Sequence, residues 1–235
     1  MSEMAIFRQL MRKMEAVLKS RNFFLRNCRL AGLLSIFLVL AIILVSGTTV
    51  PEPWTINPGG ASGAITASTT RKDLVARYGA ANVRDQDVDI GEGETEPGTA
   101  VFPRDPKRSI EILWKDPKTK RSPKSLTVRG SASLWKTVHE ITLGTSLKKL
   151  EQINGRPFEL FGFEWDYSGT VSSWQNGVLD KDLVANGRVT LRLNPSEHTP
   201  QADVDQAAGE GPFASNQPVM QKINPCVYEI SWEFP

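Results

Sequence analysis

ITASTTRKDLVARYG (residues 65–79) matches ITLGTSLKKLEQING (residues 141–155) without a gap, at an offset of 76 residues. Six of the fifteen aligned positions are identical. In both segments a pair of hydroxyl residues, Thr69-Thr70 or Thr145-Ser146, precedes an amphipathic stretch that ends at a glycine. Hydroxyl side chains cap helix N-termini, and glycine takes the left-handed conformation that commonly ends a helix. The two segments are therefore predicted to be short capped helices and two copies of one internal repeat.

The stretches after each helix alternate between apolar and polar residues with a period of two. This pattern is typical of antiparallel strands that are packed on one side and solvated on the other. The apolar positions of the expected strands are Val88 and Ile90; Ile110, Ile112 and Trp114; Phe161, Phe163, Trp165 and Tyr167; Val189, Leu191 and Leu193; and Cys226, Tyr228, Ile230, Trp232 and Phe234.

These patterns predict an α+β fold with two tandem modules, each a short helix plus an antiparallel sheet. The first module is expected over residues 64–135 and the second over 136–235. Residues 51–63 (PEPWTINPGGASG) are rich in turn-forming residues and have the composition of a linker. Residues 194–225 form a polar excursion inside the second module, expected to be either a mobile loop or a functional one.

The second helix segment, with Leu143-Gly144-Thr145-Ser146 at its start and Asn154-Gly155-Arg156-Pro157 at its end, resembles the helix motif of the SmpA/OmlA outer-membrane-assembly lipoproteins. Two such modules in tandem are similar to the β-lactamase-inhibitor-protein fold. The chain differs from the lipoproteins by lacking a lipid-bearing cysteine, and from the inhibitors by lacking their disulfides. The resemblance implies a binding or scaffolding role rather than catalysis, and it transfers no functional residue.

The N-terminal part of the sequence indicates delivery to a membrane. Residues 1–29 carry seven Lys or Arg and two Glu, a net charge of +5, whereas the remaining residues sum to −3. No charged residue occurs between Arg29 and Glu52, and LAGLLSIFLVLAIILV (30–45) is almost wholly apolar. With its neutral flank to residue 50, this run just reaches the roughly 20 residues that a membrane-spanning helix needs. The basic flank predicts a cytoplasmic N-terminus and an extracytoplasmic, periplasmic C-terminal domain.

The uncharged run is either a retained single-pass transmembrane anchor or the core of a signal peptide. A small-residue cleavage site is available at Val45-Ser46-Gly47, but the basic head of 29 residues is long for a signal peptide. Both alternatives deliver the same domain to the same side of the membrane. Cys28 and Cys226 would then lie on opposite sides of the bilayer, which excludes a disulfide between them.

An acidic stretch, DQDVDIGEGETE (85–96), has carboxylates at the first, third, fifth and twelfth positions, as in an EF-hand loop: Asp85, Asp87, Asp89 and Glu96. However, Ile90 stands where the EF-hand needs glycine. The alternative is a strand edge with Val88 and Ile90 inward and the acids outward.

The aromatic residues Phe161, Phe163, Trp165 and Tyr167, with Trp174 beyond them, have two interpretations. They either pack in the core or form an exposed strand face that binds a partner, because large aromatics dominate binding hot spots. Glu164 and Asp166 are expected on the opposite strand face, where the spacing of two carboxylates is compatible with a glycosidase.

Several functions have little support in the sequence. The folded part is mildly acidic, which disfavours nucleic acid as a partner. The chain has two histidines and no nucleotide-binding or hydrolase motif, so no cofactor and no catalytic residues are expected. We therefore expect a non-catalytic envelope protein-interaction or scaffolding module. The alternatives are a calcium-stabilised binding module and a glycan-acting hydrolase.

Overall fold

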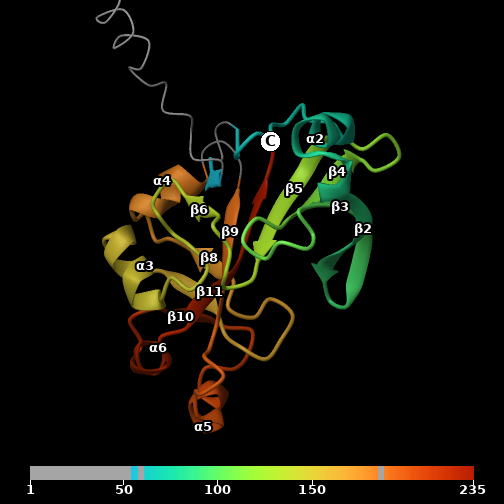
Figure 1. Ribbon diagram of the computed structural model, residues 1–235. Helices are drawn as coiled ribbons and strands as arrows, with labels where there is room; N and C mark the ends of the chain where they lie inside the picture. Colours follow the sequence, from blue (N-terminus) through green and yellow to red (C-terminus); the bar gives the residue numbers. More distant parts are fainter. Residues whose placement is uncertain (1–53, 58–60, 185–187) are drawn as a thin grey trace, which may run out of the picture. The chain divides into compact units, whose positions relative to one another are not determined.

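The computed structural model describes residues 54–57, 61–184 and 188–235, which all belong to one compact unit, Pro51–Pro235 (Figure 1). The predicted basic head and the apolar run of residues 30–50 lie outside the described residues. Among the described residues, no helix has the length and apolarity needed to span a bilayer.

The main sheet has six strands, all joined by antiparallel pairing. In spatial order they are β2 (Val83–Gly91), β3 (Glu94–Val101), β4 (Ile110–Asp116), β5 (Arg121–Arg129), β11 (Cys226–Glu233) and β9 (Val189–Asn194). The first four strands come from the predicted first module and the last two from the second. The predicted α+β class with antiparallel sheets is therefore confirmed.

Two smaller sheets complete the β-structure. One is antiparallel in the order β10 (Pro212–Ala214), β7 (Glu159–Phe161) and β8 (Val171–Ser173). An isolated bridge between Thr170 and Arg192 connects its β8 edge to β9 of the main sheet. The other is a parallel ribbon of β1 (Thr55–Ile56) and β6 (Lys136–Thr137).

The predicted helices are present as α2 (Arg71–Tyr78) and α3 (Leu147–Asn154), which lie 76 residues apart like the sequence match. The hydroxyls of Thr70 and Ser146 accept the backbone N–H of the third helical residue in each. Gly79 and Gly155 end the helices with positive φ, and Gly155 is left-handed. A 3-10 turn (Ala80–Asn82) follows α2, and three further short helices lie later in the chain: α4 (Val178–Val184), α5 (Gln201–Asp205) and α6 (Pro218–Ile223).

One hydrophobic cluster runs through both predicted modules. Leu74 from α2 and Leu150 from α3 are both almost fully buried in it. Trp135 and Trp232, from opposite sides of the predicted module boundary, contact each other within the cluster, with ring centroids 6.1 Å apart. The halves therefore share a core as well as a sheet.

The predicted linker is wrong where the structure describes it. Ile56 in β1 and Ser62 are both fully buried. The backbone carbonyl of Trp54 accepts the N–H of Lys136 at 3.0 Å, and its ring contacts Trp135 edge-on. Because the segment is rich in turn-forming residues, its sequence did not reveal that Trp54 and Ile56 pack into the fold beside a parallel ribbon.

The predicted loop at residues 194–225 contains α5, β10 and α6. β10 pairs with β7, and Met220 and Ile223 of α6 are buried in the core. The segment is thus a structured insertion within the second half.

Two strands depart from the predicted alternation because each contains a register shift. In β11 the shift lies between Val227 and Glu229, so both are buried, and Cys226 and Tyr228 are only half-buried. Ile230, Trp232 and Phe234 face the core as predicted. In β2 the shift lies between Asp89 and Gly91 and leaves Ile90 exposed, contrary to its predicted inward position.

Candidate partner-binding site

The strand that was predicted to carry all the aromatic residues ends at Phe161, two residues before the next predicted aromatic position. A Cβ on Gly162 would lie 2.6 Å or less from the carbonyl oxygens of Ala207 and Gly209, so the chain packs here only with glycine. The backbone N–H and the backbone carbonyl of Phe163 are both hydrogen-bonded to the same 207–209 segment, and the Phe163 side chain is buried. Glu164 then has a φ of 65°, which turns the chain out of the strand direction.

This turn gathers three of the five predicted aromatic residues into one cluster. The ring centroids of Phe161 and Trp165 lie 5.4 Å apart, and those of Trp165 and Tyr167 lie 5.3 Å apart, both in edge-on geometry. Phe161 and Tyr167 are 6.4 Å apart, which closes the triangle. The Trp165 indole N–H donates to the Gly162 carbonyl at 3.0 Å and fixes the central ring. We call Phe161, Trp165 and Tyr167 the aromatic cluster.

The other two candidates belong to the core. Phe163 is 1% exposed, and Trp174 packs against Phe158 with ring centroids 5.0 Å apart. The prediction of one aromatic strand face is therefore wrong. The core interpretation holds for Phe163 and Trp174, whereas the aromatic cluster lies outside the hydrophobic core. Tyr167 is 53% exposed.

Arg192 of β9 holds the loop that carries the cluster. Its guanidinium donates to the backbone carbonyls of Asp166 at 2.8 Å and Ser168 at 3.4 Å, and it lies 5.7 Å from the Tyr228 ring. Gly169 packs against the backbone of Leu193, and the Leu193 N–H donates to the Gly169 carbonyl. The loop is thus attached to the main sheet by backbone contacts.

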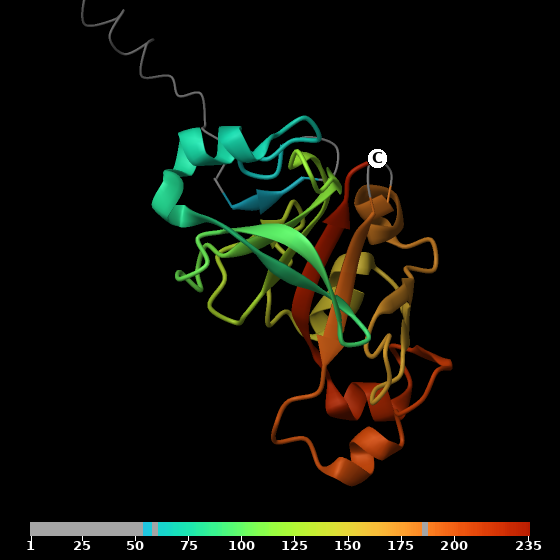
Figure 2. The same ribbon diagram turned by 90° about the vertical axis from the view of Figure 1, so that its right-hand side faces the viewer.

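The tip of the β2–β3 hairpin approaches the aromatic cluster from the other half of the chain. The Tyr167 hydroxyl donates to the Glu92 carboxylate at 3.4 Å. A shallow depression between the hairpin tip and the loop that carries the cluster is lined by Asp89, Glu92, Glu94, Thr95, Asp166 and Arg192. The two views show the long β2–β3 hairpin extending away from α2 toward the lower part of the domain (Figures 1 and 2). The aromatic cluster therefore has an acidic rim from both halves of the chain.

A partly buried ion network lies beside the β2–β3 hairpin. Arg129 of β5 donates to Glu229 at 2.7 Å and also pairs with Glu111, which accepts from Gln86. Burial lowers the pKa of Arg129, but the charges of Glu229 and Glu111 outweigh burial and raise it above its ordinary value. The guanidinium also reaches the backbone carbonyl of Asp89, so this network supports the hairpin.

The predicted calcium ligands do not form a loop. In the β2–β3 pairing Asp85, Asp87 and Asp89 stand opposite Thr99, Pro97 and Thr95, whereas Glu96 stands opposite Val88. Cross-strand partners point to the same face and successive residues alternate, so Glu96 lies on the other face from the three aspartates. In the part of the chain that the structure describes, no three acidic, His or Cys residues are grouped as metal ligands would be.

Asp85 is held by protein cations. It lies 2.8 Å from Arg71 and 2.6 Å from Lys120. Partial burial raises its pKa, but hydrogen bonds from Lys120, Arg71 and Thr99 outweigh burial and keep the pKa below its ordinary value. The carboxylate thus joins α2 to the sheet.

The carboxylates of the hydrolase hypothesis occupy the same turn as the aromatic cluster. The prediction that Glu164 and Asp166 share a strand face is wrong, because the strand ends before them. Glu164 accepts a hydrogen bond from Gln201 of α5 at 2.7 Å, whereas Asp166 lines the depression at the hairpin tip.

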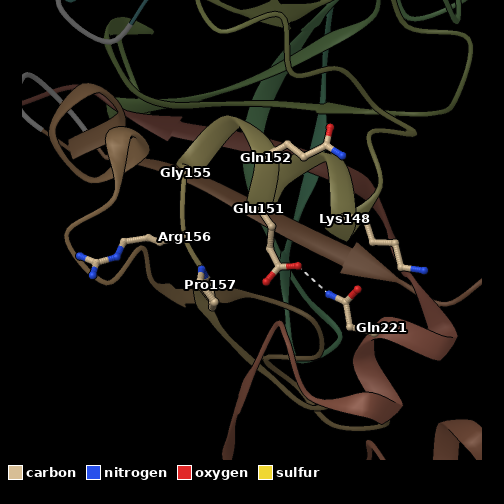
Figure 3. Close-up of a pocket in the computed structure, with 7 residues that line it drawn as sticks. All are labelled: Lys148, Glu151, Gln152, Gly155, Arg156, Pro157 and Gln221. Carbon is tan, nitrogen blue, oxygen red and sulfur yellow. Dashed lines mark hydrogen bonds between the residues drawn. The ribbon is translucent and has the colours of Figure 1, made fainter.

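A second open depression lies between α3 and α6 (Figure 3). Glu151 is its central polar group and accepts hydrogen bonds from Gln221 at 2.6 Å and Ser215 at 2.9 Å. The side chains of Lys148 and Arg156 extend away from each other rather than converging (Figure 3). The polar groups of this depression thus bond α3 to α6 rather than converging on a ligand. The aromatic cluster is therefore the stronger candidate for a binding site.

The chain matches no protein-family model, and no curated protein or solved structure is significantly similar to it.

Proposed function

We propose that this protein is a single-pass membrane protein whose extracytoplasmic, periplasmic domain binds another envelope protein without catalysing a reaction. The basic head and the uncharged run of residues 30–50 support the topology. Retention of this run as an anchor is the form that we propose, and cleavage near residue 46 remains the alternative. The aromatic cluster is the binding site in either case.

The observation that carries the proposal is the pre-assembled cluster of Phe161, Trp165 and Tyr167, in which Tyr167 is exposed and the other two rings are half-buried. Apolar rings in mutual edge-on contact give a partner a large contact area with little loss of side-chain freedom. The loop is fixed through Arg192, so the rings are ordered before a partner arrives. An acidic rim beside aromatic anchors adds selectivity for partners of complementary charge.

We also propose that the two halves are tandem modules of one kind. The N–H of Thr66 donates to the Thr69 hydroxyl at 2.9 Å, and Thr142 donates to Thr145 at the same distance. Isolated bridges join Thr70 to Arg121 in β5 and Ser146 to Cys226 in β11, the last strand of each half. β5 and β11 then pair with each other and join the modules into one sheet.

Partner capture tests the binding site. The full chain would be purified from gently solubilised membranes, and the proteins retained with it identified. Tyr167→Ala removes an exposed hot-spot candidate and is expected to weaken binding by about 2 kcal/mol, roughly thirtyfold. Val178→Ala is the matched control, because Val178 is also 53% exposed but lies outside the aromatic cluster.

The supporting result is one partner that Tyr167→Ala loses and Val178→Ala retains, with unchanged circular dichroism. If a partner binds both variants like the wild-type chain, the aromatic cluster is not the binding site. A reporter that is active only outside the cytoplasm, fused after Pro235, tests topology separately. An inactive but well-expressed fusion would refute the proposed orientation.

A further inference from the structure

The start of the described chain is fixed to the folded domain. Trp54 packs edge-on against Phe102 and Trp135, with ring centroids 6.1 and 5.4 Å away. Thr55 and Ile56 pair in parallel with Lys136 and Thr137, and Ile56 is fully buried. Trp54 therefore already belongs to the folded domain, which was predicted to start only near residue 64.

Only Pro51, Glu52 and Pro53 separate Trp54 from the end of the uncharged run at Val50. An extended chain spans at most about 3.3–3.6 Å per residue, so four steps cover no more than about 14 Å. A free linker to residue 63 would instead have reached more than about 40 Å. With residues 30–50 in the bilayer, the surface around Trp54 stays close to the membrane.

That surface is the outer face of the β1–β6 ribbon. Along residues 134–138 the side chains alternate, with Trp135 and Thr137 buried and Leu134 and Val138 exposed by 48% and 47%. These are two of the five large hydrophobic side chains that the described part of the chain exposes. Lys136 lies between them on the outer face, where its ammonium pairs with the carboxylate of Glu140 at 3.0 Å.

The two exposed side chains lie at opposite ends of the ribbon. Because β1 and β6 are parallel, Leu134 lies at the end where Trp54 enters and Val138 at the other end. Lys107 adds a second cation beside Leu134, since its carbonyl accepts the Leu134 N–H at 2.8 Å. Lysine side chains can cover apolar surface while their ammonium groups remain at the headgroup level.

We propose that the outer face of the β1–β6 ribbon, with Leu134 and Val138 as its apolar contacts, rests on the lipid surface from which the chain emerges. This inference rests on the retained anchor of the proposed function. Tryptophan is favoured at the membrane–water interface, which suits Trp54 at the entry to the domain. Docking here leaves α5, at the opposite end of the domain from β1 in both views, far from the lipid (Figures 1 and 2).

The test uses the full chain in lipid vesicles whose headgroups carry a nitroxide quencher. Cys28 and Cys226 are replaced by serine, and a fluorophore is attached at Lys107→Cys or, as the distant control, at Ala202→Cys in α5. We expect most of the fluorescence at position 107 to be lost and that at position 202 to be retained. In the double variant Leu134→Asp and Val138→Asp, the loss at position 107 should fall to the level at position 202.

Each other outcome refutes the inference in a different way. Equal quenching at positions 107 and 202 shows that no face is preferred. Quenching at position 107 that survives the two aspartates shows that the tether, not the ribbon face, holds the domain there. Release of the wild-type chain from membranes by alkaline carbonate overturns the anchor and the docking together, whereas retention without quenching overturns the docking alone.

Discussion

The starts of α2 and α3 are alike in local chemistry and different in tertiary surroundings. Both helices have eight residues and a hydroxyl cap, and both close with a glycine whose N–H donates to a carbonyl four residues back at 2.9 Å. However, α2 buries only Leu74, whereas α3 buries Leu147, Leu150 and Asn154. Apart from an exposed lysine, the residues common to the two segments build the turns at the helix ends and supply two core contacts, an isoleucine before the helix and a leucine within it. They therefore specify a helix start and not its environment.

The later parts of the two halves explain this difference. The strands that follow α2 form a long hairpin, with nine residues in β2 and eight in β3, whereas β7 and β8 have three each. In the second half α4 and the 194–225 insertion supply the additional packing. Asn154 bonds to backbone beside α4, and Glu151 bonds to Gln221 of α6. The second helix is thus enclosed on more sides than the first.

Truncation of the shared leucines should have the largest effect. Leu150→Ala and Leu74→Ala each remove a fully buried side chain and should lower the free energy of unfolding by about 2–5 kcal/mol. We expect Leu150→Ala to lower the free energy of unfolding more than Leu74→Ala does, because α3 is enclosed by α4 and α6. Denaturant unfolding of the purified protein measures both values.

The matched controls are Lys148→Ala and Lys72→Ala, two positions before each leucine. Both lysines are exposed, and their loss should change stability by less than about 0.5 kcal/mol. A cost below about 1 kcal/mol for Leu74→Ala would break the equivalence of the two helices.

The next largest effect is expected at Asn154, a buried amide of a kind that α2 lacks. Its side-chain amide donates to the carbonyls of Arg156 and Trp174, and its oxygen accepts the Leu179 N–H, all within 3.2 Å. Asn154→Ala leaves buried backbone groups unpaired and should cost roughly 2–4 kcal/mol. A Cβ on Gly177 would lie 2.0 Å from the same amide, so the site has no room for rearrangement.

The aligned residue in α2, Tyr78, provides the comparison. It is only half-buried and contacts Phe102 edge-on, so Tyr78→Leu should cost about 1 kcal/mol in the same unfolding experiment. Equal costs at the two positions would mean that α3 is not more deeply integrated than α2.

The sequence was sufficient for features that are encoded locally. The caps at Thr70 and Ser146 and the glycines at 79 and 155 predicted both helices. Regular alternation predicted β9 correctly, and in β4 it predicted the buried positions Ile110, Ile112 and Trp114 but not Leu113, which is also buried next to a register shift. These signals act within a few residues, so they can be read without knowledge of the partners across the fold.

The sequence failed where distant contacts decide the conformation. Residues 161–167 alternate like a strand, but packing of Gly162 on the 207–209 segment and the turn at Glu164 end that strand. Ile56 is one apolar residue in a turn-rich stretch, and only its pairing beside Thr137 makes it part of the core. One missed local signal was Pro218 at the first position of α6, where proline is favoured.

The helix caps should give a smaller effect, with a difference between the halves. Thr70 and Asp73 form a reciprocal capping box, whereas Ser146 accepts one bond from Lys149. Removing either hydroxyl should cost about 1 kcal/mol, with Thr70→Ala the more costly. Thr70→Ser keeps the hydroxyl and should recover most of the loss. Thermal unfolding of the three variants measures these effects, and a larger loss for Ser146→Ala would reverse the expected order.

The smallest expected effect is the pH dependence of stability that arises from protonation of Asp73. It is also the effect that best distinguishes the two helix caps. The side-chain hydrogen bond from the Thr70 hydroxyl, followed by that from its backbone N–H, holds the pKa of Asp73 below its ordinary value of 3.8. Because the folded-state pKa is lowered, this stabilisation is complete above the unfolded-state pKa and is lost as the pH falls through the folded-state pKa. The corresponding residue in α3 is Lys149, which has no carboxylate to protonate.

The measurement is the melting temperature of the wild-type chain, Asp73→Asn and Ser146→Ala from about pH 6 to about pH 3. Other carboxylates, such as Asp85 and Asp116, also have lowered pKa values, so every protein will lose stability in acid and only differences from wild type are informative. The difference for Asp73→Asn should be constant above about pH 5 and narrow below about pH 4. The difference for Ser146→Ala should not change, because its cap bonds involve no acidic group. A constant difference for Asp73→Asn would mean that ionisation of the carboxylate does not strengthen the first cap, and the two caps would then not differ in their response to pH.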